Sequence, residues 1–376
     1  MTKLLILTAG YGEGHNAAAR NLAAASVALP GFGTTQVVDL LAQVSPRFNR
    51  LSRLAYLAAI NRVPGLWSAF YRWIDQHELF PRHLWLLRKE LRQLDLLVRR
   101  EQPAVICCTF PIYGFLLERL ARTGRLAAPF YNVVTDSISI NSLWARPACT
   151  GWFVPNEETA DVMRAQGVPA AKLEVLGFPV PAFFSEQARL LAPPDLAAGA
   201  PPRVLYIVHS GVRHAWATAR RLLDECDWEL TFAVGRDDRL RQRLERLAAG
   251  RRRRTEILGW TNEVPRLLMT HHVVISKAGG ATTQEAIAAR CPMLVNQVVP
   301  GQEEGNYELL RRRGVGGLVE TPEAAIQTLR RAFADQGALW RRWRDALAPL
   351  ARPEASREIA ERLLSGAARP AVETAP

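Results

Sequence analysis

The chain alternates short aliphatic runs with longer segments of mixed polarity. In its first half the runs KLLILT, TQVVDL, AVICCTF and FYNVVTD are separated by segments with a helical pattern. A strand followed by a helix, repeated along a chain, is typical of parallel βαβ units. The first half therefore predicts a doubly wound parallel sheet.

The same rhythm restarts after a stretch rich in alanine, proline and glycine, at residues 191–202. The second half contains the strand-like runs RVLYIVH, ELTFAVG, TEILGW, HHVVISK and MLVNQVV. We therefore predict an α/β fold with two doubly wound, Rossmann-like domains that face a cleft at the carboxyl ends of their strands. The expected divisions are an N-terminal domain (1–190), a C-terminal domain (202–340), a C-terminal helix that packs back toward the N-terminal domain (341–365) and a disordered tail (366–376).

Composition narrows the classes of protein that fit. The 376 residues are 48% hydrophobic, but no stretch of eighteen uncharged apolar residues occurs, and the first ten residues have the pattern of a strand. We therefore expect an intracellular protein that does not span a membrane. The five cysteines show no C-x-x-C spacing, so neither a disulfide framework nor a zinc site is indicated. The net charge of +12 attracts any polyanion and does not choose among them.

A glycine turn with a histidine follows the first strand. The run TAGYGEGHNAAARNL places Gly12, Gly14 and His15 where an alanine-rich helix begins, so that backbone N–H groups can approach a ligand in the cleft. The positive end of a helix dipole favours a neutral imidazole, which suits a general base, although a capping role fits the motif equally well. A dinucleotide fingerprint would need glycine in place of His15, and Asp39 keeps that alternative open.

Two further residues follow the strand FYNVVTD. Asp136 can orient a base or accept a proton, and it can equally cap the next helix. Trp144 can be a core residue or a platform for an acceptor.

The segment from residue 276 to residue 306 combines a glycine turn, a carboxylate and a polar loop. Its strand VVISK leads into a helix start that can bind a diphosphate without a metal ion, through the backbone or side chains of Lys277, Gly279, Gly280, Ala281, Thr282 and Thr283. Glu285, one turn into the helix, can accept both hydroxyls of a ribose. The next loop offers paired donors and acceptors to a hexose, at Gln302, Glu303, Glu304 and Asn306.

These motifs together resemble the monogalactosyldiacylglycerol synthase and processive diacylglycerol glucosyltransferase family of GT-B glycosyltransferases, relatives of the peptidoglycan GlcNAc transferase. The resemblance covers most of the chain and rests on GEGHNAAA, VVTD with Trp144 after it, VLGFPVPAFF, FAVGRDDRL, LGWTNEV, SKAGGATTQEA and VPGQEEGN. It implies that His15 is the catalytic base and Asp136 its partner. It also implies donor contacts: the nucleotide base near Gly259, Trp260 and Thr261, the ribose on Glu285, the phosphates on residues 280–283, and the sugar on Gln302 and Glu303.

The chain departs from the family pattern at two places. Members that resemble plant galactolipid synthases usually carry histidine where this chain has Asn141, and this departure bears on the identity of the acceptor. The glycine-rich loop after RVLYIVH retains only Gly211, and there Arg213 and His214 either contact phosphate or lie at the surface.

The stretch between residues 45 and 100 is aromatic and basic. Trp67, Phe70, Tyr71 and Ile74 share one helical face among several arginines, which fits a helix inserted among anionic headgroups or one packed on its own domain. The resemblance favours membrane docking, because a lipid acceptor is reached at the bilayer surface. No nucleic-acid-binding module is present, and we expect no nucleic-acid partner.

We therefore expect transfer of galactose or glucose from UDP-galactose or UDP-glucose to diacylglycerol, with inversion and without a metal or other cofactor. The expected location is cytoplasmic, peripheral on the inner face of the plasma membrane, at an anionic surface. Two alternatives stay open: a UDP-sugar transferase with a non-lipid acceptor or a UDP-sugar epimerase on the same fold, and a non-catalytic dinucleotide- or nucleic-acid-binding protein.

Overall fold

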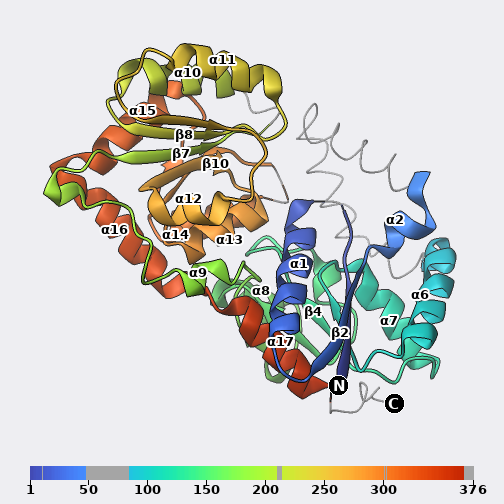
Figure 1. Cartoon of the computed structure of the whole chain (residues 1–376). Coiled ribbons are helices and arrows are strands. Elements are labelled where there is room, and N and C mark those ends of the chain that lie inside the picture. The colour runs from blue at the N-terminus through green and yellow to red at the C-terminus, as the bar shows by residue number, and fades with distance from the viewer. Residues whose placement is uncertain (11, 48–83, 210–213, 300, 302, 368–376) are drawn as a thin grey trace. The chain divides into compact units, whose positions relative to one another are not determined.

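The computed structural model describes residues 1–10, 12–47, 84–209, 214–299, 301 and 303–367. The chain divides into two compact units (Figure 1). Unit 1 comprises Met1–Ala182, Pro300–Gly305 and Glu354–Pro376, and unit 2 comprises Phe183–Val299 and Asn306–Pro353. Each unit is built on its own six-stranded parallel sheet.

The sheet of unit 1 has the strand order β2-β1-β3-β4-β5-β6. Its strands are β1 (Thr2–Leu7), β2 (Phe32–Val38), β3 (Val105–Cys108), β4 (Phe130–Val133), β5 (Gly151–Val154) and β6 (Leu173–Val175). Successive side chains of β1 point to opposite faces, and both sets are buried: Leu5 and Leu7 pack in one core, Leu4 and Ile6 in the other. A parallel sheet that is covered on both faces explains why the aliphatic runs of the sequence are nearly continuous.

Helices cover both faces of this sheet. They are α1 (Glu13–Ala28), α2 (Leu40–Val44), α6 (Arg88–Glu101), α7 (Ile112–Arg122), α8 (Glu157–Ala165) and α17 (Ala355–Gly366), with short 3-10 turns at Leu84–Leu87, Ser142–Trp144 and Ala170–Lys172. The helix α17 lies beside α1 (Figure 1), and its Ile359 and Leu363 pack in the same core as Leu22 of α1. The last described helix of the chain therefore completes the unit that the first strand begins.

The sheet of unit 2 has the strand order β12-β11-β10-β7-β8-β9. Its strands are β7 (Arg203–Ile207), β8 (Glu229–Ala233), β9 (Thr255–Leu258), β10 (Val273–Lys277), β11 (Met293–Gln297) and β12 (Gly317–Leu318). The helices of this half of the chain are α9 (Phe183–Glu186), α10 (Ala215–Glu225), α11 (Asp238–Ala248), α12 (Val264–Thr270), α13 (Gly280–Ala288), α14 (Glu304–Arg312), α15 (Pro322–Phe333) and α16 (Ala338–Leu347). Figure 1 shows α10, α11 and α15 on one face of the sheet and α12 and α13 on the other.

The prediction of two doubly wound parallel sheets is confirmed. The strand-like runs of the sequence all contain observed strands, whereas the short strands β5, β6 and β12 were not predicted. Within the described part of the chain, no helix is long and apolar enough to cross a bilayer. Several predicted sites lie outside the described residues: Trp67, Phe70, Tyr71, Ile74, Gly211, Arg213, Gln302 and the tail from residue 368 onward.

Candidate active site

His15 lies in the first turn of α1, where the glycine loop after β1 becomes helical. The side chain is almost fully buried, with 6% of its surface exposed. Its ring packs edge-on against Phe110, with the ring centroids 5.1 Å apart, and lies 6.3 Å from the ring of Trp144. Buried alanines one turn further along α1, at Ala18 and Ala19, let this face of the helix approach the sheet closely.

The hydrogen bonds of His15 determine which ring nitrogen carries the proton. Nδ1 lies 2.8 Å from the carbonyl oxygen of Thr109 and 2.7 Å from Oγ1 of Thr135. A carbonyl oxygen can only accept, so Nδ1 carries the hydrogen and Nε2 keeps its lone pair. Burial lowers the pKa of His15, while the charge of Asp136 and the bond to Thr109 partly oppose this. The ring is therefore neutral near pH 7, with Nε2 able to accept a proton.

Strand order brings these three groups together. His15 follows β1, Thr109 follows β3 and Thr135 follows β4, and these strands are neighbours in the sheet. Because the strands are parallel, all three residues lie at the carboxyl edge of the sheet, where side chains after strand ends converge. The predicted site residue His15 is thus joined by Thr109 and Thr135, to which sequence reasoning assigned no role.

Asp136 is held by a tryptophan. The indole Nε1–H of the fully buried Trp144 donates to Oδ2 of Asp136 at 2.9 Å, and the indole N–H of Trp152 donates to the carbonyl oxygen of Trp144 at 2.7 Å. Asn141 begins the 3-10 turn that carries Trp144, because its Oδ1 accepts the N–H of Leu143 at 2.9 Å. The residue that departs from the family pattern, Asn141, therefore has a structural partner in this turn.

The glycine loop before α1 is fixed by Asp39. One carboxylate oxygen of Asp39 accepts the N–H of Gly10 at 2.9 Å, and the other accepts the N–H of Ala42 at 2.9 Å. Both oxygens therefore have backbone partners, which weakens the dinucleotide alternative, in which this carboxylate binds a ribose. Gly12 and Gly14 lie half-buried at the start of α1. A Cβ on Gly12 would meet no atom of the described residues within 4 Å.

In unit 2 the predicted phosphate turn joins β10 to α13. Lys277 ends β10, and Gly279 is the residue before the helix, with no side chain capping the first N–H groups. Gly280, Ala281 and Thr282 form the first turn and are half-buried. Uncapped N–H groups at a helix start attract an anion, in keeping with the predicted diphosphate site.

The two threonines of α13 are placed differently. Thr283 is fully buried, and its hydroxyl lies 3.8 Å from the sulfur of Met293 on β11. Its side chain therefore faces the sheet, and Thr282 is the better placed hydroxyl for a phosphate. Glu285, the predicted ribose ligand, is half-buried one turn further along.

The other predicted donor residues follow the ends of β9 and β11 in the same sheet. Gly259, Trp260 and Thr261 come after β9, and Trp260 is exposed over 64% of its surface, as a side chain that stacks on a base can be. In the polar loop, Nδ2 of the buried Asn306 donates to the carbonyl oxygen of Ala278 at 3.0 Å, which ties this loop to the phosphate turn. The Asn306 Oδ1 has no hydrogen-bond partner among the described residues.

The start of the polar loop belongs to unit 1. Glu303 is buried, and Gly305 approaches the segment after Asp136 so closely that a Cβ would lie 1.7 Å from the carbonyl oxygen of Ser137 and 2.5 Å from the N–H of Ser139. Only glycine fits at this contact.

His209 is a second residue without a predicted role. It follows β7, and its Nε2 lies 3.0 Å from Oγ of Ser276 on the neighbouring β10. Burial, together with the positive charge of Lys277, lowers the pKa of His209 to about 4. A polar residue at the end of a predicted strand was the sequence signal that could have indicated His209.

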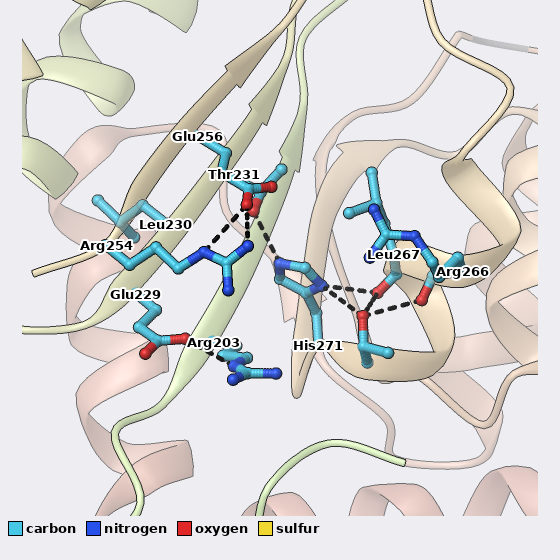
Figure 2. A pocket seen from close by; sticks show the side chains of 10 residues that line it. Arg203, Glu229, Leu230, Thr231, Arg254, Glu256, Arg266, Leu267 and His271 are labelled. Carbon is cyan, nitrogen blue, oxygen red and sulfur yellow. Dashed lines mark hydrogen bonds and ion pairs between the residues drawn. The ribbon is translucent and has the colours of Figure 1, made fainter. Parts of the chain in front are cut away.

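A cavity of about 90 Å³ in unit 2 lies at the other edge of the sheet (Figure 2). It is lined by the amino ends of β7 and β8, by β9 and by the end of α12. Four of its charged side chains pair with one another: Arg203 contacts Glu229 at 2.6 Å, and Arg254 contacts Glu256. The cavity therefore lies away from the predicted donor residues, which follow the carboxyl ends of the strands.

Comparison with known proteins finds a family model that matches part of the chain, distant relatives, and solved structures that share the fold. The model of the monogalactosyldiacylglycerol (MGDG) synthase family matches residues 15–180. A processive diacylglycerol beta-glucosyltransferase of Bacillus cereus (strain AH820) is 24% identical over 373 residues, which cover 96% of this chain and 93% of the relative. The resemblance stated from the motifs is confirmed as a distant homology.

Solved structures share the fold at low sequence identity. The S. aureus MnaA–UDP co-structure has a TM-score of 0.62 and 14% identity, covering 96% of this chain and 95% of that chain. MurG of Acinetobacter baumannii has a TM-score of 0.61 and 13% identity, covering 97% and 100%. These likenesses establish the GT-B fold for the chain.

Proposed function

We propose that the chain is a glycosyltransferase that moves a hexose from a UDP-sugar to diacylglycerol, because the MGDG synthase family model matches residues 15–180. The name of the B. cereus relative supports the acceptor, and the UDP in the MnaA co-structure supports the donor. The predicted contacts to the phosphates, the ribose and the nucleotide base belong to unit 2, whereas His15 and the predicted sugar contact Glu303 belong to unit 1. The sugar would be galactose or glucose.

The observation that carries this proposal is the state of His15. Its Nδ1–H is bound to the Thr109 carbonyl oxygen at 2.8 Å, and burial keeps the ring neutral, so Nε2 is left as a base. Nε2 would take the proton of the acceptor hydroxyl, and the hydroxyl oxygen would form a bond to C1 of the hexose. The bond from C1 to the β-phosphate oxygen breaks, UDP leaves with the electron pair, and the configuration at C1 is inverted.

The leaving diphosphate needs positive groups that are already in place. The first turn of α13 presents uncapped N–H groups. Lys277, at the end of β10, lies two residues before Gly279 in the sequence. Preorganised groups of this kind stabilise charge where it develops in the transition state. In this proposal they take the place of a metal ion or other cofactor.

We further propose that unit 1 docks on an anionic membrane surface through the start of α6. Trp85 and Leu86 are each exposed over 62% of their surface, and the exposed cations Arg88, Lys89 and Arg92 follow them. Because α6 runs back toward the amino end of β3, its first turn lies at the carboxyl edge of the sheet, as His15 does. Exposed aromatic and aliphatic side chains beside cations suit a headgroup region, and this end of unit 1 would meet a lipid acceptor.

The experiment that tests this function offers the protein UDP-galactose or UDP-glucose with and without vesicles that contain diacylglycerol. We expect a glycolipid product with one or both donors only when diacylglycerol is present. His15→Ala should abolish turnover while UDP binding survives, and Arg20→Ala, an exposed change on the same helix, should leave turnover unchanged. An isomerised sugar nucleotide without glycolipid would support an epimerase instead, and activity in His15→Ala would remove His15 as the base.

A further inference from the structure

Thr135 contacts the buried ring nitrogen of His15. Its Oγ1 lies 2.7 Å from Nδ1, and the carbonyl oxygen of Thr109 lies 2.8 Å from the same nitrogen. Thr109 and Thr135 are both buried, so water does not compete for these contacts. Since Nδ1 donates to the carbonyl, the Thr135 oxygen is a second acceptor for the same N–H.

Asp136, the next residue, does not occupy this position. Its Oδ2 accepts the indole N–H of Trp144 at 2.9 Å, and Trp144 is in turn held by Trp152. Asp136 is the charged group that acts on the His15 ring, and it does so through its charge, which raises the pKa of His15 against the larger effect of burial. Orientation of the ring and compensation of its charge are therefore divided between two neighbouring side chains.

We propose that Thr135 is the side chain that positions the base: its hydroxyl oxygen, together with the Thr109 carbonyl, holds His15 in the Nδ1–H tautomer and directs Nε2 toward the acceptor hydroxyl. This inference rests on the proposed function of His15. Neither the expected pairing of His15 with Asp136 nor any sequence motif assigns this role to Thr135.

The interaction between Thr135 and His15 is strongest during proton transfer from the acceptor hydroxyl. Nε2 takes the acceptor proton, the ring becomes an imidazolium, and the hydrogen on Nδ1 stays in place. A cationic N–H donates more strongly than a neutral one, so the two oxygens bind the ring more tightly in the transition state than before it. The hydroxyl of Thr135 should therefore affect kcat more than KM.

The first test compares Thr135→Val, which has the same shape without the hydroxyl, with Thr135→Ser, which restores it. Thr135→Val should lower kcat by at least about ten-fold and leave KM for the donor within about two-fold, while Thr135→Ser stays near wild type. The acid limb of its pH–rate profile should move to lower pH, because the imidazolium loses an acceptor. Thr8→Val is the matched control, since the Thr8 hydroxyl donates to Asn16 at 2.9 Å and not to His15. A Thr135→Val enzyme with wild-type kcat and limb would overturn the inference.

The second test measures the protonation of the His15 ring in the wild-type protein. In wild-type protein labelled with ¹⁵N-histidine, the ring signals of His15, identified by their loss in His15→Ala, should show Nδ1 protonated and Nε2 unprotonated at neutral pH. The opposite tautomer would overturn the inference. The two proposals fail separately: turnover in His15→Ala removes the base and with it the role of Thr135, whereas an inactive His15→Ala beside a fully active Thr135→Val removes only Thr135.

Discussion

At the scale of single residues, the protonation of His15 depends on the balance between burial, which lowers its pKa, and the charge of Asp136, which raises it. Asp136→Asn removes the opposing charge, so the pKa of His15 should fall further below its ordinary value of about 6.5. The base works when it is neutral, and activity is lost as the pH falls through this pKa. We therefore expect the acid limb of kcat/KM against pH to move to lower pH, with a lower maximum because the imidazolium is less stabilised.

A matched carboxylate tests whether this shift is specific. Asp95 lies in the same unit but pairs with Arg99 on α6 at 2.9 Å. Asp95→Asn should leave the acid limb of the kcat/KM profile unchanged. If the acid limb of Asp136→Asn is unchanged or moves to higher pH, the electrostatic role assigned to Asp136 is contradicted.

Part of this site could be predicted from the sequence. His15 and Asp136 follow predicted strands, and such positions gather at one edge of a parallel sheet. Thr109 contributes only its backbone, which no side-chain motif indicates, and Thr135 meets His15 only because β1, β3 and β4 are neighbours. That order differs from the order along the chain, so the sequence could not predict the contact.

At the scale of elements, the surface at the start of α6 can be separated from the catalytic residues. Replacing both Trp85 and Leu86 by alanine removes two exposed apolar side chains and no charge. If they insert among lipids, binding to anionic vesicles should weaken by at least about ten-fold, because each buried apolar side chain contributes about 1.5–3 kcal/mol. Vesicle sedimentation measures this, and turnover on a detergent-solubilised acceptor should be retained.

Val27 offers a comparison for that surface. It is exposed over 77% of its surface at the end of α1, which lies at the amino edge of the same sheet. Val27→Ala should sediment with vesicles as wild type does. If the variant that lacks both Trp85 and Leu86 binds vesicles as tightly as wild type, the start of α6 does not dock on the membrane.

Elements with long aliphatic runs were predictable, and the shorter ones were not. The strand β5 has the sequence GWFV, and β6 has only LEV, so neither gives a clear pattern until its neighbour supplies hydrogen bonds. Trp144 shows the same limit, because an aromatic residue after a strand fits an acceptor platform and a core position equally well, and packing places it at zero exposure.

At the scale of the whole molecule, unit 2 carries histidines that fold in the neutral state. Burial is the main cause that lowers the pKa of His209, His271 and His272 to about 4. In the unfolded chain these histidines bind protons near pH 6.5, whereas in the folded chain they stay neutral down to about pH 4. The free energy of unfolding is therefore unaffected by them above pH 6.5 and falls as the pH falls from about 6.5 to about 4. Each can contribute about 3 kcal/mol over this range, and urea unfolding at pH 7.5 and pH 5 should show a clear loss of stability.

His271 allows a direct check of that linkage. Its ring nitrogens lie 2.7 Å from the Leu267 carbonyl oxygen and 2.9 Å from the Thr231 hydroxyl. His271→Gln should be less stable at pH 7.5 but lose less on acidification. A wild-type stability that is the same at both pH values would contradict the linkage.

The place of α17 affects how the protein is made. A chain emerges from the ribosome with its N-terminus first, and domains usually fold in that order. Here Leu4 and Leu22 share their core with Ile359 and Leu363, which are synthesised after all of unit 2. The core of unit 1 is therefore completed only after α17 has been synthesised, and until then part of one face of its sheet is uncovered or is shielded by a chaperone.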